Sequence, residues 1–284
     1  MGGFFHRHRG LTPYLLLAPG LLWLAVFFLV PLAYLGYQSL RSGIYPSFEF
    51  TWEVSNYAEV WDYREQLQRS FLYAGLATVA ALLLSYPLVY WIAFRAGRWR
   101  NLFLLAIVAP FFVTYLIRTL AWLNILADEG PVVGALQWLH LLGEDDRLLA
   151  TSFAVVSGIT YNFLPFMALP LYVSLEQIDP RLLEAAKDLY ASPAQAFLRV
   201  TLPLSAPGMV AGTLLTFIPA AGDFINAELL GTPRQQMIGN VIQGKFLESL
   251  DYPTAASLSF VLMAAILVAV LAYARAVGSE KLTG

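Results

Sequence analysis

Apolar residues along the chain gather into six long runs that are separated by shorter polar segments. The runs cover approximately residues 14–38, 70–94, 102–126, 150–175, 207–230 and 255–274. About twenty helical residues cross the hydrocarbon core of a bilayer, so each run is long enough for one crossing. The first run is too long for a cleavable signal peptide and lacks a small-residue cleavage site, so we expect it to remain as a span. The pattern predicts an all-α membrane protein with six transmembrane helices in a single domain over residues 1–284.

Composition agrees with this pattern and narrows the possible chemistry. The 284 residues are 58% hydrophobic and only 13% charged, which is well below the charge of a soluble domain. The chain has no cysteine, which excludes disulfides, thiolate metal sites and a cysteine nucleophile. It also lacks a P-loop motif, an HExxH pair, a GxSxG turn and a histidine cluster, so we expect no metal site and no catalytic site. A net charge of -2 gives no indication of nucleic-acid binding.

Lysine and arginine in the connecting segments predict how the spans are oriented. If the N-terminus is cytoplasmic, the inner segments hold 10 of these residues in 55 positions, and the outer segments hold 6 in 76. The higher density on the inner side favours a cytoplasmic location for both termini. The polar segment between the fourth and fifth runs then also lies in the cytoplasm.

This polar segment, residues 176–208, contains the signals of two short helices. Asp179 before Pro180 is typical of an N-cap followed by proline at the first helical position. Ser192, with Gln195 three residues later, forms a capping box for the second helix. Leucines and alanines recur at helical spacing in the first helix between charged residues, so this helix is amphipathic. An apolar face outside the membrane needs a partner.

The same segment resembles the EAA loop of binding-protein-dependent ABC importer permeases. The matched positions are Glu184, Ala185, Ala186, Ala191, Ser192, Phe197, Val200, Leu202, Pro203, Pro207 and Gly208. In that family the loop is a cytoplasmic coupling helix that docks on the ATP-hydrolysing subunit. The resemblance therefore implies a type I ABC importer permease (MetI-like) fold. It implies ATPase-coupling roles for Glu184, Ala185, Ala186, Asp188, Tyr190, Ala191 and Ser192.

One position departs from the family pattern, because Tyr190 stands where the family usually has glycine. That glycine ends the first helix in a left-handed conformation, which suits glycine and penalises tyrosine. We therefore expect the turn after this helix to be built differently here.

Polar residues also occur inside the spans, where lipid would not tolerate them. In the third span Pro110, Thr114, Arg118 and Trp122 recur every four residues, which predicts that they form one helical face. Arg118 is costly in an apolar run unless it faces a partner or a water-filled cavity. The run PFFVTYLIRTLAW resembles the same span of polyamine-importer permeases. Because like charges repel, we interpret Arg118 as a structural partner and not as a ligand for a cationic substrate.

The fourth and fifth spans carry further candidates for the substrate path. The fourth contains Tyr161, Asn162 and the helix-kinking Pro165. The fifth, FIPAAGDFINAELLGTPRQQMIGNVI, resembles the matching region of spermidine and putrescine permeases. Irregular backbone at membrane depth is tolerated where it lines a cavity or is buried in protein. Our path candidates are Asp223, Glu228, Trp122, Tyr161, Asn162 and Phe224, and our structural candidates in the membrane are Arg118, Pro110, Pro165, Pro219 and Gly222.

Two interpretations of Asp223 stay open at this stage. Its carboxylate could contact a passing ammonium, or it could pair with Arg118 or with a partner subunit. Nearby aromatic rings could add cation-π contacts, although packing explains them equally well.

The resemblance implies a subunit that forms the path for a small solute, most similar to the polyamine permeases, and that has no catalysis of its own. It implies a related second permease, an ATPase dimer that binds ATP and magnesium, an extracytoplasmic binding protein and a location in the bacterial inner membrane. No cofactor is expected in this chain. A permease for ferric ion or an aminophosphonate is an alternative within the class, and an intramembrane enzyme is an alternative from another class.

Overall fold

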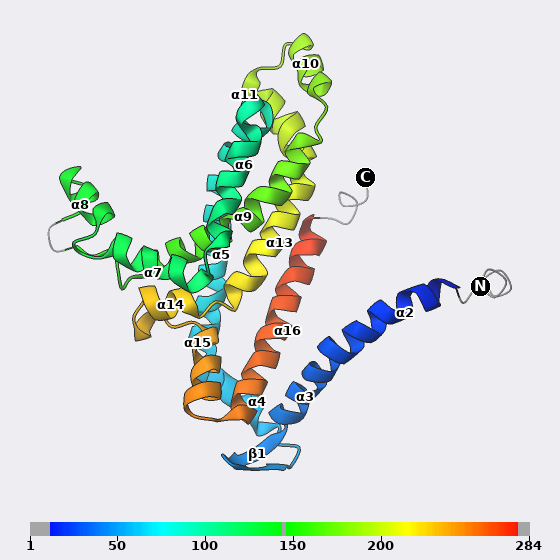
Figure 1. The fold of residues 1–284 in the computed structure, drawn as a ribbon, viewed down its shortest axis with the longest axis vertical. Helices are drawn as coiled ribbons and strands as arrows, with labels where there is room; N and C mark the ends of the chain where they lie inside the picture. The colour runs from blue at the N-terminus through cyan, green and yellow to red at the C-terminus, as the bar shows by residue number, and fades with distance from the viewer. Residues whose placement is uncertain (1–11, 144–145, 278–284) are drawn as a thin grey trace. The chain divides into compact units, whose positions relative to one another are not determined.

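The computed structural model describes residues 12–143 and 146–277, which are almost entirely helical (Figure 1). Contacts divide the chain into two compact units, Met1–Trp61 with Gly244–Val261, and Asp62–Gln243 with Leu262–Gly284. The chain passes between the units within η2 (Glu59–Tyr63) and within α16 (Tyr252–Val277). Each unit is described by itself, and the prediction of one domain over the whole chain stays a prediction.

The first unit contains one long helical segment and the only strands of the described residues. Its elements are α2 (Thr12–Leu24), η1 (Ala25–Leu29), α3 (Val30–Ser39), β1 (Arg41–Ile44), β2 (Ser47–Phe50), α4 (Ser55–Ala58) and η7 (Gly244–Glu248), followed by the start of α16. The strands pair antiparallel, with Arg41 opposite Phe50. The buried Asn56 side chain donates to the main-chain oxygens of Ser39 and Arg41 at 2.9 and 2.8 Å, so it fixes the base of the hairpin. Hydropathy did not predict this hairpin, because its residues are not an apolar run.

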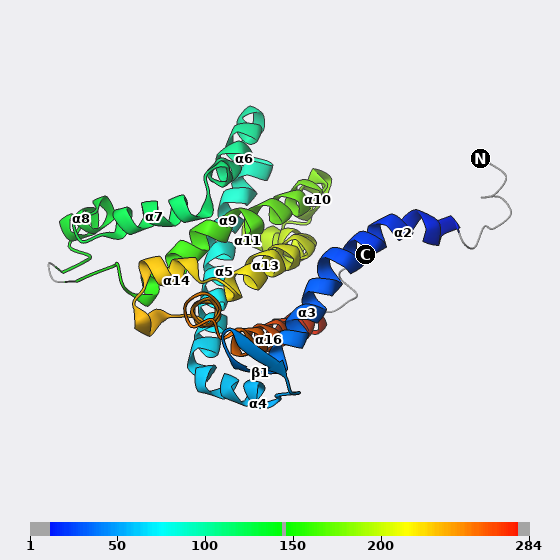
Figure 2. The same cartoon turned by 60° about the horizontal axis from the view of Figure 1, so that its bottom comes forward.

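Three long helices form the centre of the second unit: α5 (Arg64–Phe94), α9 (Ser152–Glu176) and α13 (Ala206–Ala221), which lie side by side in Figures 1 and 2. Close approach of α13 to α9 depends on two glycines. A Cβ at Gly208 would lie 2.7 Å from the Pro170 carbonyl oxygen, and one at Gly212 would lie 2.9 Å from that of Met167. Small residues at four-residue spacing permit such backbone contact between membrane helices.

Shorter elements surround these three helices. They are η3 (Gly97–Trp99), α6 (Arg100–Val108), η4 (Ala109–Phe112), α7 (Tyr115–Leu126), α8 (Pro131–Trp138), α10 (Pro180–Asp188), α11 (Pro193–Ala196), η5 (Phe197–Thr201), α12 (Leu202–Leu204), α14 (Ile225–Leu230), η6 (Pro233–Gln235) and α15 (Ile238–Gln243). Within this unit α10 and α11 lie at one end of the three central helices α5, α9 and α13. The helices α7 and α14 lie beside the central helices, away from that end (Figure 1).

The number of helices that are long and apolar enough to cross a membrane equals the six predicted spans if each bent helix pair is counted as one span. Within the described residues four single helices qualify: Leu16–Ser39, Ser55–Phe94, Ser152–Glu176 and Tyr252–Ala276. Two bent helix pairs also qualify when each is taken together, Gly97–Phe112 with Tyr115–Trp138, and Pro193–Leu204 with Ala206–Ala221, so the described residues hold four spans, or six if each bent pair is one span. The chain therefore has the all-α architecture that the sequence predicts.

The prediction that Pro110, Thr114, Arg118 and Trp122 share one helical face is wrong. The helix ends at Phe112 and a new one begins at Tyr115, with a 98° bend between the two segments. Val113 and Thr114 are extended, with ψ angles of 138° and 148°. Pro110 has no N–H to continue a helical ladder, and its segment tightens into a 3-10 turn that stops at Phe112. Only Arg118 and Trp122 remain on a common helix.

Candidate functional site

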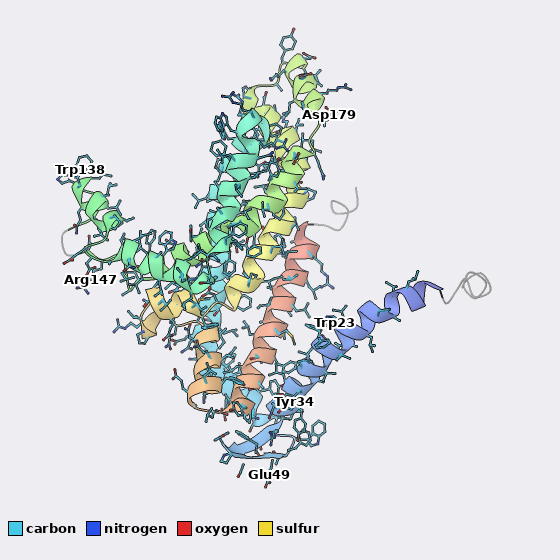
Figure 3. All side chains as sticks on the ribbon, in the orientation of Figure 1. Trp23, Tyr34, Glu49, Trp138, Arg147 and Asp179 are labelled. Atoms are coloured by element: carbon cyan, nitrogen blue, oxygen red, sulfur yellow. The ribbon has the colours of Figure 1, made fainter. Side chains whose placement is uncertain are left out.

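The polar segment between α9 and α13 has the two helix starts that the sequence predicts. Asp179 accepts a hydrogen bond from the main-chain nitrogen of Arg181 at 2.9 Å, and α10 begins with Pro180. Ser192 and Gln195 form the capping box of α11, with the Ser192 nitrogen 2.9 Å from Gln195 Oε1. Figure 3 labels Asp179 at the end of the second unit from which α10 projects.

The end of α10 corrects the expectation that Tyr190 changes the turn. Tyr190 has φ +59°, so it occupies the left-handed conformation that the family's glycine would adopt. The main-chain nitrogen of Tyr190 donates to the Lys187 oxygen at 2.9 Å, and that of Ala191 donates to the Ala186 oxygen at 3.0 Å. These two hydrogen bonds define a Schellman motif, which satisfies the last carbonyls of the helix. The motif outweighs the steric cost of the tyrosine, so the turn is built in the usual way.

The surface of α10 is open on most sides. No residue of this helix is buried, and Glu184, Ala185 and Asp188 are exposed. Among the other predicted coupling residues, Ser192 is exposed and Ala186 and Ala191 are half-buried. The side chains of Leu189 and Tyr190 are 82% and 97% exposed, which leaves an apolar tip without a cover among the described residues. Such a surface is suited to a partner protein.

A second group of polar side chains lies at membrane depth, where the break after α13 faces the start of α7. Asp223 is only 7% exposed, and its carboxylate is fully hydrogen-bonded. Oδ1 accepts from the main-chain nitrogen of Asn226 at 2.9 Å, so Asp223 satisfies a main-chain donor in the first turn of α14. Oδ2 accepts from Asn226 Nδ2 at 2.9 Å and from the hydroxyl of Tyr115. The carboxylate thus ties the broken end of the fifth span to α7.

Asn226 extends this network to α9. Its Nδ2 donates to the Tyr115 hydroxyl at 2.6 Å, and its Oδ1 accepts from Asn162 Nδ2 at 3.2 Å. Asn162 Nδ2 also donates to Thr119 Oγ1 at 3.1 Å. Gly158 leaves room for this arrangement, because a Cβ there would lie 2.5 Å from Asn226 Oδ1. The sequence identified Asn162 and Asp223, but not Thr119 or Gly158, since neither is charged or irregular within its span.

Arg118 is buried close to this network without joining it. It is 8% exposed, and Nε and Nη1 have no hydrogen-bond partner among the described residues. Its guanidinium lies over the rings of Phe111 and Tyr115, at 4.7 and 5.6 Å from the ring centroids. In residues 12–143 and 146–277 Arg118 forms no ion pair, so the open pairing with Asp223 is not seen in this conformation.

The remaining predicted path residues are divided between two places. Trp122 of α7 and Tyr161 of α9 pack ring against ring, with centroids 5.5 Å apart. Glu228 is exposed and accepts from Asn240 Nδ2 at 3.0 Å, and the same amide donates to the main-chain oxygen of Phe224 at 2.9 Å. Glu228 and Phe224 therefore line a separate surface between α14 and α15.

The structural candidates differ in how they are placed. Pro165 is buried inside α9, which continues through it to Glu176, whereas Pro219 is exposed near the end of α13. Gly222 follows α13 at the break and closes it with a hydrogen bond from its nitrogen to the Pro219 oxygen at 3.2 Å. Pro110 is half-buried in η4, just before the bend of the third span.

Comparison with known proteins identifies the class to which these features belong. Residues 11–277 match the family described as binding-protein-dependent transport system inner membrane component. The chain belongs to this family. It is therefore a permease of a binding-protein-dependent ABC importer, and its helices are those of a multi-pass inner-membrane protein.

Relatives of the permease share most of its length. It is 37% identical over 257 residues to the spermidine/putrescine transport system permease protein PotB of Escherichia coli K12, covering 89% of this chain and 94% of that protein. It is 32% identical to the inner membrane ABC transporter permease protein YdcU of the same strain, covering 98% and 94%. Among solved structures, a bacterial alginate ABC transporter in complex with its periplasmic protein matches with a TM-score of 0.75, at 17% identity over 98% of this permease and 97% of that chain. That likeness is one of fold.

Proposed function

We propose that the permease carries a polyamine, spermidine or putrescine, across the inner membrane. The observation that supports this most is the 37% identity to a spermidine/putrescine permease over nearly nine-tenths of the chain. The relatives reported above offer no comparable support for ferric ion or an aminophosphonate. A buried carboxylate at the broken fifth span, beside several aromatic rings, suits a cationic solute.

The partners follow from the exposed surface and from the family. An ATPase dimer, which binds ATP and magnesium, would dock on α10 and its apolar tip at Leu189 and Tyr190. Glu184, Ala185 and Asp188 supply the exposed part of that contact. A related second permease would complete the path, and an extracytoplasmic binding protein would deliver the solute. Both termini then lie in the cytoplasm, as the lysine and arginine distribution favours.

Movement of α10 can reach the intramembrane network through continuous elements. Only three residues separate the end of α9 at Glu176 from α10, so a displacement of α10 acts directly on α9. Arg100 at the start of α6 pairs with Glu176 and donates to the Tyr172 hydroxyl, which couples α6 to the same end of α9. The contacts at Gly208 and Gly212 hold α13 against α9. These three helices would therefore respond to the ATPase together.

Asp223 is the residue through which a joint movement of α6, α9 and α13 would act on a cation in the path. Its carboxylate is occupied by the Tyr115 hydroxyl and by Asn226 in the present conformation. Separation of α7 from α14 would take the Tyr115 hydroxyl away from Oδ2 and leave Asn226 as the remaining side-chain donor. The carboxylate could then offset part of the hydration that a polyamine loses. The site would be transient, because the same separation must reverse before the next cycle.

Reconstitution of the complete importer tests the proposal. The permease is combined in proteoliposomes with its second permease, its ATPase and its binding protein, and ATP-dependent uptake of labelled spermidine and putrescine is measured. We expect uptake that requires both ATP and the binding protein. Absence of polyamine uptake by a complex that hydrolyses ATP in response to a different loaded binding protein would contradict the polyamine assignment. The permease alone should turn over no substrate.

A further inference from the structure

Arg118 occupies an aromatic cage at membrane depth. We define the cage by Phe111 and Tyr115, whose rings contact the guanidinium, and by Phe163 and Phe166, whose rings pack against those two. The ring centroids of Phe111 and Phe166 are 5.2 Å apart, those of Tyr115 and Phe163 are 6.0 Å apart, and those of Phe163 and Phe166 are 6.1 Å apart. The faces of such rings attract an organic cation.

Two of the three nitrogens of the guanidinium in this cage lack, within the described part of the chain, the hydrogen bonds that a buried guanidinium normally makes. Nε and Nη1 of Arg118 are buried and have no acceptor among the described residues. A buried charge without a counter-charge or acceptors is costly, and unsatisfied donors add to that cost. Of the two rings that contact the guanidinium, Tyr115 belongs to the helix that carries Arg118 and Phe111 lies before the bend. Among the described residues the guanidinium has ring contacts but no ion pair, which makes it easier to displace than a paired arginine.

The cage adjoins the carboxylate that we place on the solute path. Tyr115 belongs to both, because its ring faces the Arg118 guanidinium and its hydroxyl donates to Asp223 Oδ2. A cation in the cage is thus separated from a carboxylate by a single phenol side chain. Withdrawal of the phenol would bring cage and carboxylate into one site.

We propose that the cage is a binding site for an alkylammonium or guanidinium cation, and that Arg118 is a tethered competitor for it. Arg118 fills the site while no solute is present, and an arriving cation displaces it. The identity of the natural cation rests on the proposed function, but the existence of the site does not. Because Arg118 competes with the free cation for the same rings, it weakens cation binding without changing which cations the site prefers. Weaker binding lets the solute leave the site again and pass on.

Chemical rescue tests the site directly. Arg118→Ala removes the side chain and leaves the cage vacant for a free cation. We expect added ethylguanidinium to raise the melting temperature of the full-length Arg118→Ala chain in detergent by about 2–4 °C at a concentration tenfold above its Kd. The wild-type chain, whose cage is filled, should shift less. Arg234→Ala, which removes an exposed arginine outside the membrane, is the matched control and should show no rescue.

Neutral and structural controls decide between a cation site and a simple cavity. N-ethylurea has nearly the shape of ethylguanidinium without its charge, and it should give no rescue of Arg118→Ala. Equal rescue by the urea, or none by ethylguanidinium, overturns the proposal. If Arg118→Ala does not fold well enough to be measured, Arg118→Gln serves in its place. The double variant Arg118→Gln with Phe111→Ala should lose the rescue, because it removes the nearest ring.

The result is separable from the test of the proposed function. Rescue by ethylguanidinium with no polyamine uptake in the complete importer would retain the cation site and reject polyamines as the solute. Uptake of polyamines without any rescue would retain the solute and reject the cage as its site. Spermidine added to Arg118→Ala links the two, since it should raise the melting temperature only if both hold.

Discussion

Single residues carry the features of this permease that sequence patterns describe least well. Tyr190 adopts a left-handed conformation although it is not glycine, and the Schellman hydrogen bonds hold it there. Asp223 is recognisable in the sequence as a carboxylate in an apolar run, but its contact with Tyr115 is not, because the two residues lie more than a hundred positions apart along the chain. A sequence shows that a buried charge needs partners, whereas only packing of α7 against α14 decides which residues these are.

Replacement of Tyr190 by glycine should stabilise the chain. The left-handed conformation costs an L-residue roughly 1–2 kcal/mol, and the greater freedom of glycine in the unfolded chain offsets part of this gain. We expect Tyr190→Gly to raise the free energy of unfolding by about 0.5–1 kcal/mol, measured as a higher melting temperature in detergent. Tyr190→Phe keeps the strain and should show no gain. A lower melting temperature for the glycine variant would contradict the assignment of strain to this residue.

Replacement of Asp223 should slow transport. Asp223→Asn removes the charge, and Asp223→Lys replaces attraction for a cation by repulsion, so uptake should fall in the first variant and nearly vanish in the second. Uptake and ATPase activity are measured together in the reconstituted importer, while solute affinity of the isolated binding protein should not change. Tyr115→Phe, which removes the hydroxyl that occupies Oδ2, is the structural control. Normal uptake by Asp223→Asn would leave the hydrogen bond to the first turn of α14 as the role of this residue.

At the scale of elements, the apolar runs predicted where helices lie but not where they break. The third run is continuous in hydropathy, yet its helix stops at Phe112 and restarts at Tyr115. Extended backbone at Val113 and Thr114 has no strong signal in the sequence, since the nearest proline lies three residues earlier. The helix starts at Asp179 and Ser192 were predictable because capping is a local interaction between neighbouring residues. Contacts between distant helices, such as those of Gly208, leave no comparable local signal.

The contact between α9 and α13 should tolerate no enlargement. A Cβ at Gly208 would lie 2.9 Å from Leu171 Cα and 2.7 Å from the Pro170 oxygen, and backbone atoms cannot move aside easily. We expect Gly208→Ala to lower the free energy of unfolding by about 1–3 kcal/mol. Gly75→Ala in α5 is the matched control, because a Cβ there has no neighbour within 4 Å and alanine favours a helix. Equal melting temperatures for the two variants would show that α13 does not pack on α9 at this point.

At the scale of the whole molecule, family membership settled what single motifs only suggested. The segment at residues 176–208 indicates a permease of a binding-protein-dependent importer, and the match over residues 11–277 shows this family over nearly the whole chain. Subunit composition and solute lie beyond the fold, because both depend on surfaces that meet other proteins.

Reversal of the charge at Glu184 tests the proposed contact with the ATPase. Glu184 is exposed on α10, so Glu184→Lys should leave membrane insertion intact and weaken the complex by changing the charge at the interface. The measurement is co-purification of the ATPase with the tagged permease. Glu49→Lys, on the hairpin labelled in Figure 3, reverses an exposed charge elsewhere and should co-purify normally. Unchanged recovery of the ATPase with Glu184→Lys would reject α10 as its docking site.

The glycine contacts that join α13 to α9 also determine which hydrogen bonds part first when α10 is pushed. Asn162 lies fourteen residues from the end of α9 at Glu176, which is about 21 Å along a helix. A rigid tilt of about 10° about that end would carry Asn162 roughly 4 Å sideways, more than the length of a hydrogen bond. If α13 moves together with α9, Asn226, which follows α13, would move with them. The segment after the 98° bend would move less, so we expect the hydrogen bonds of Thr119 with Asn162 and of Tyr115 with Asp223 and Asn226 to break first.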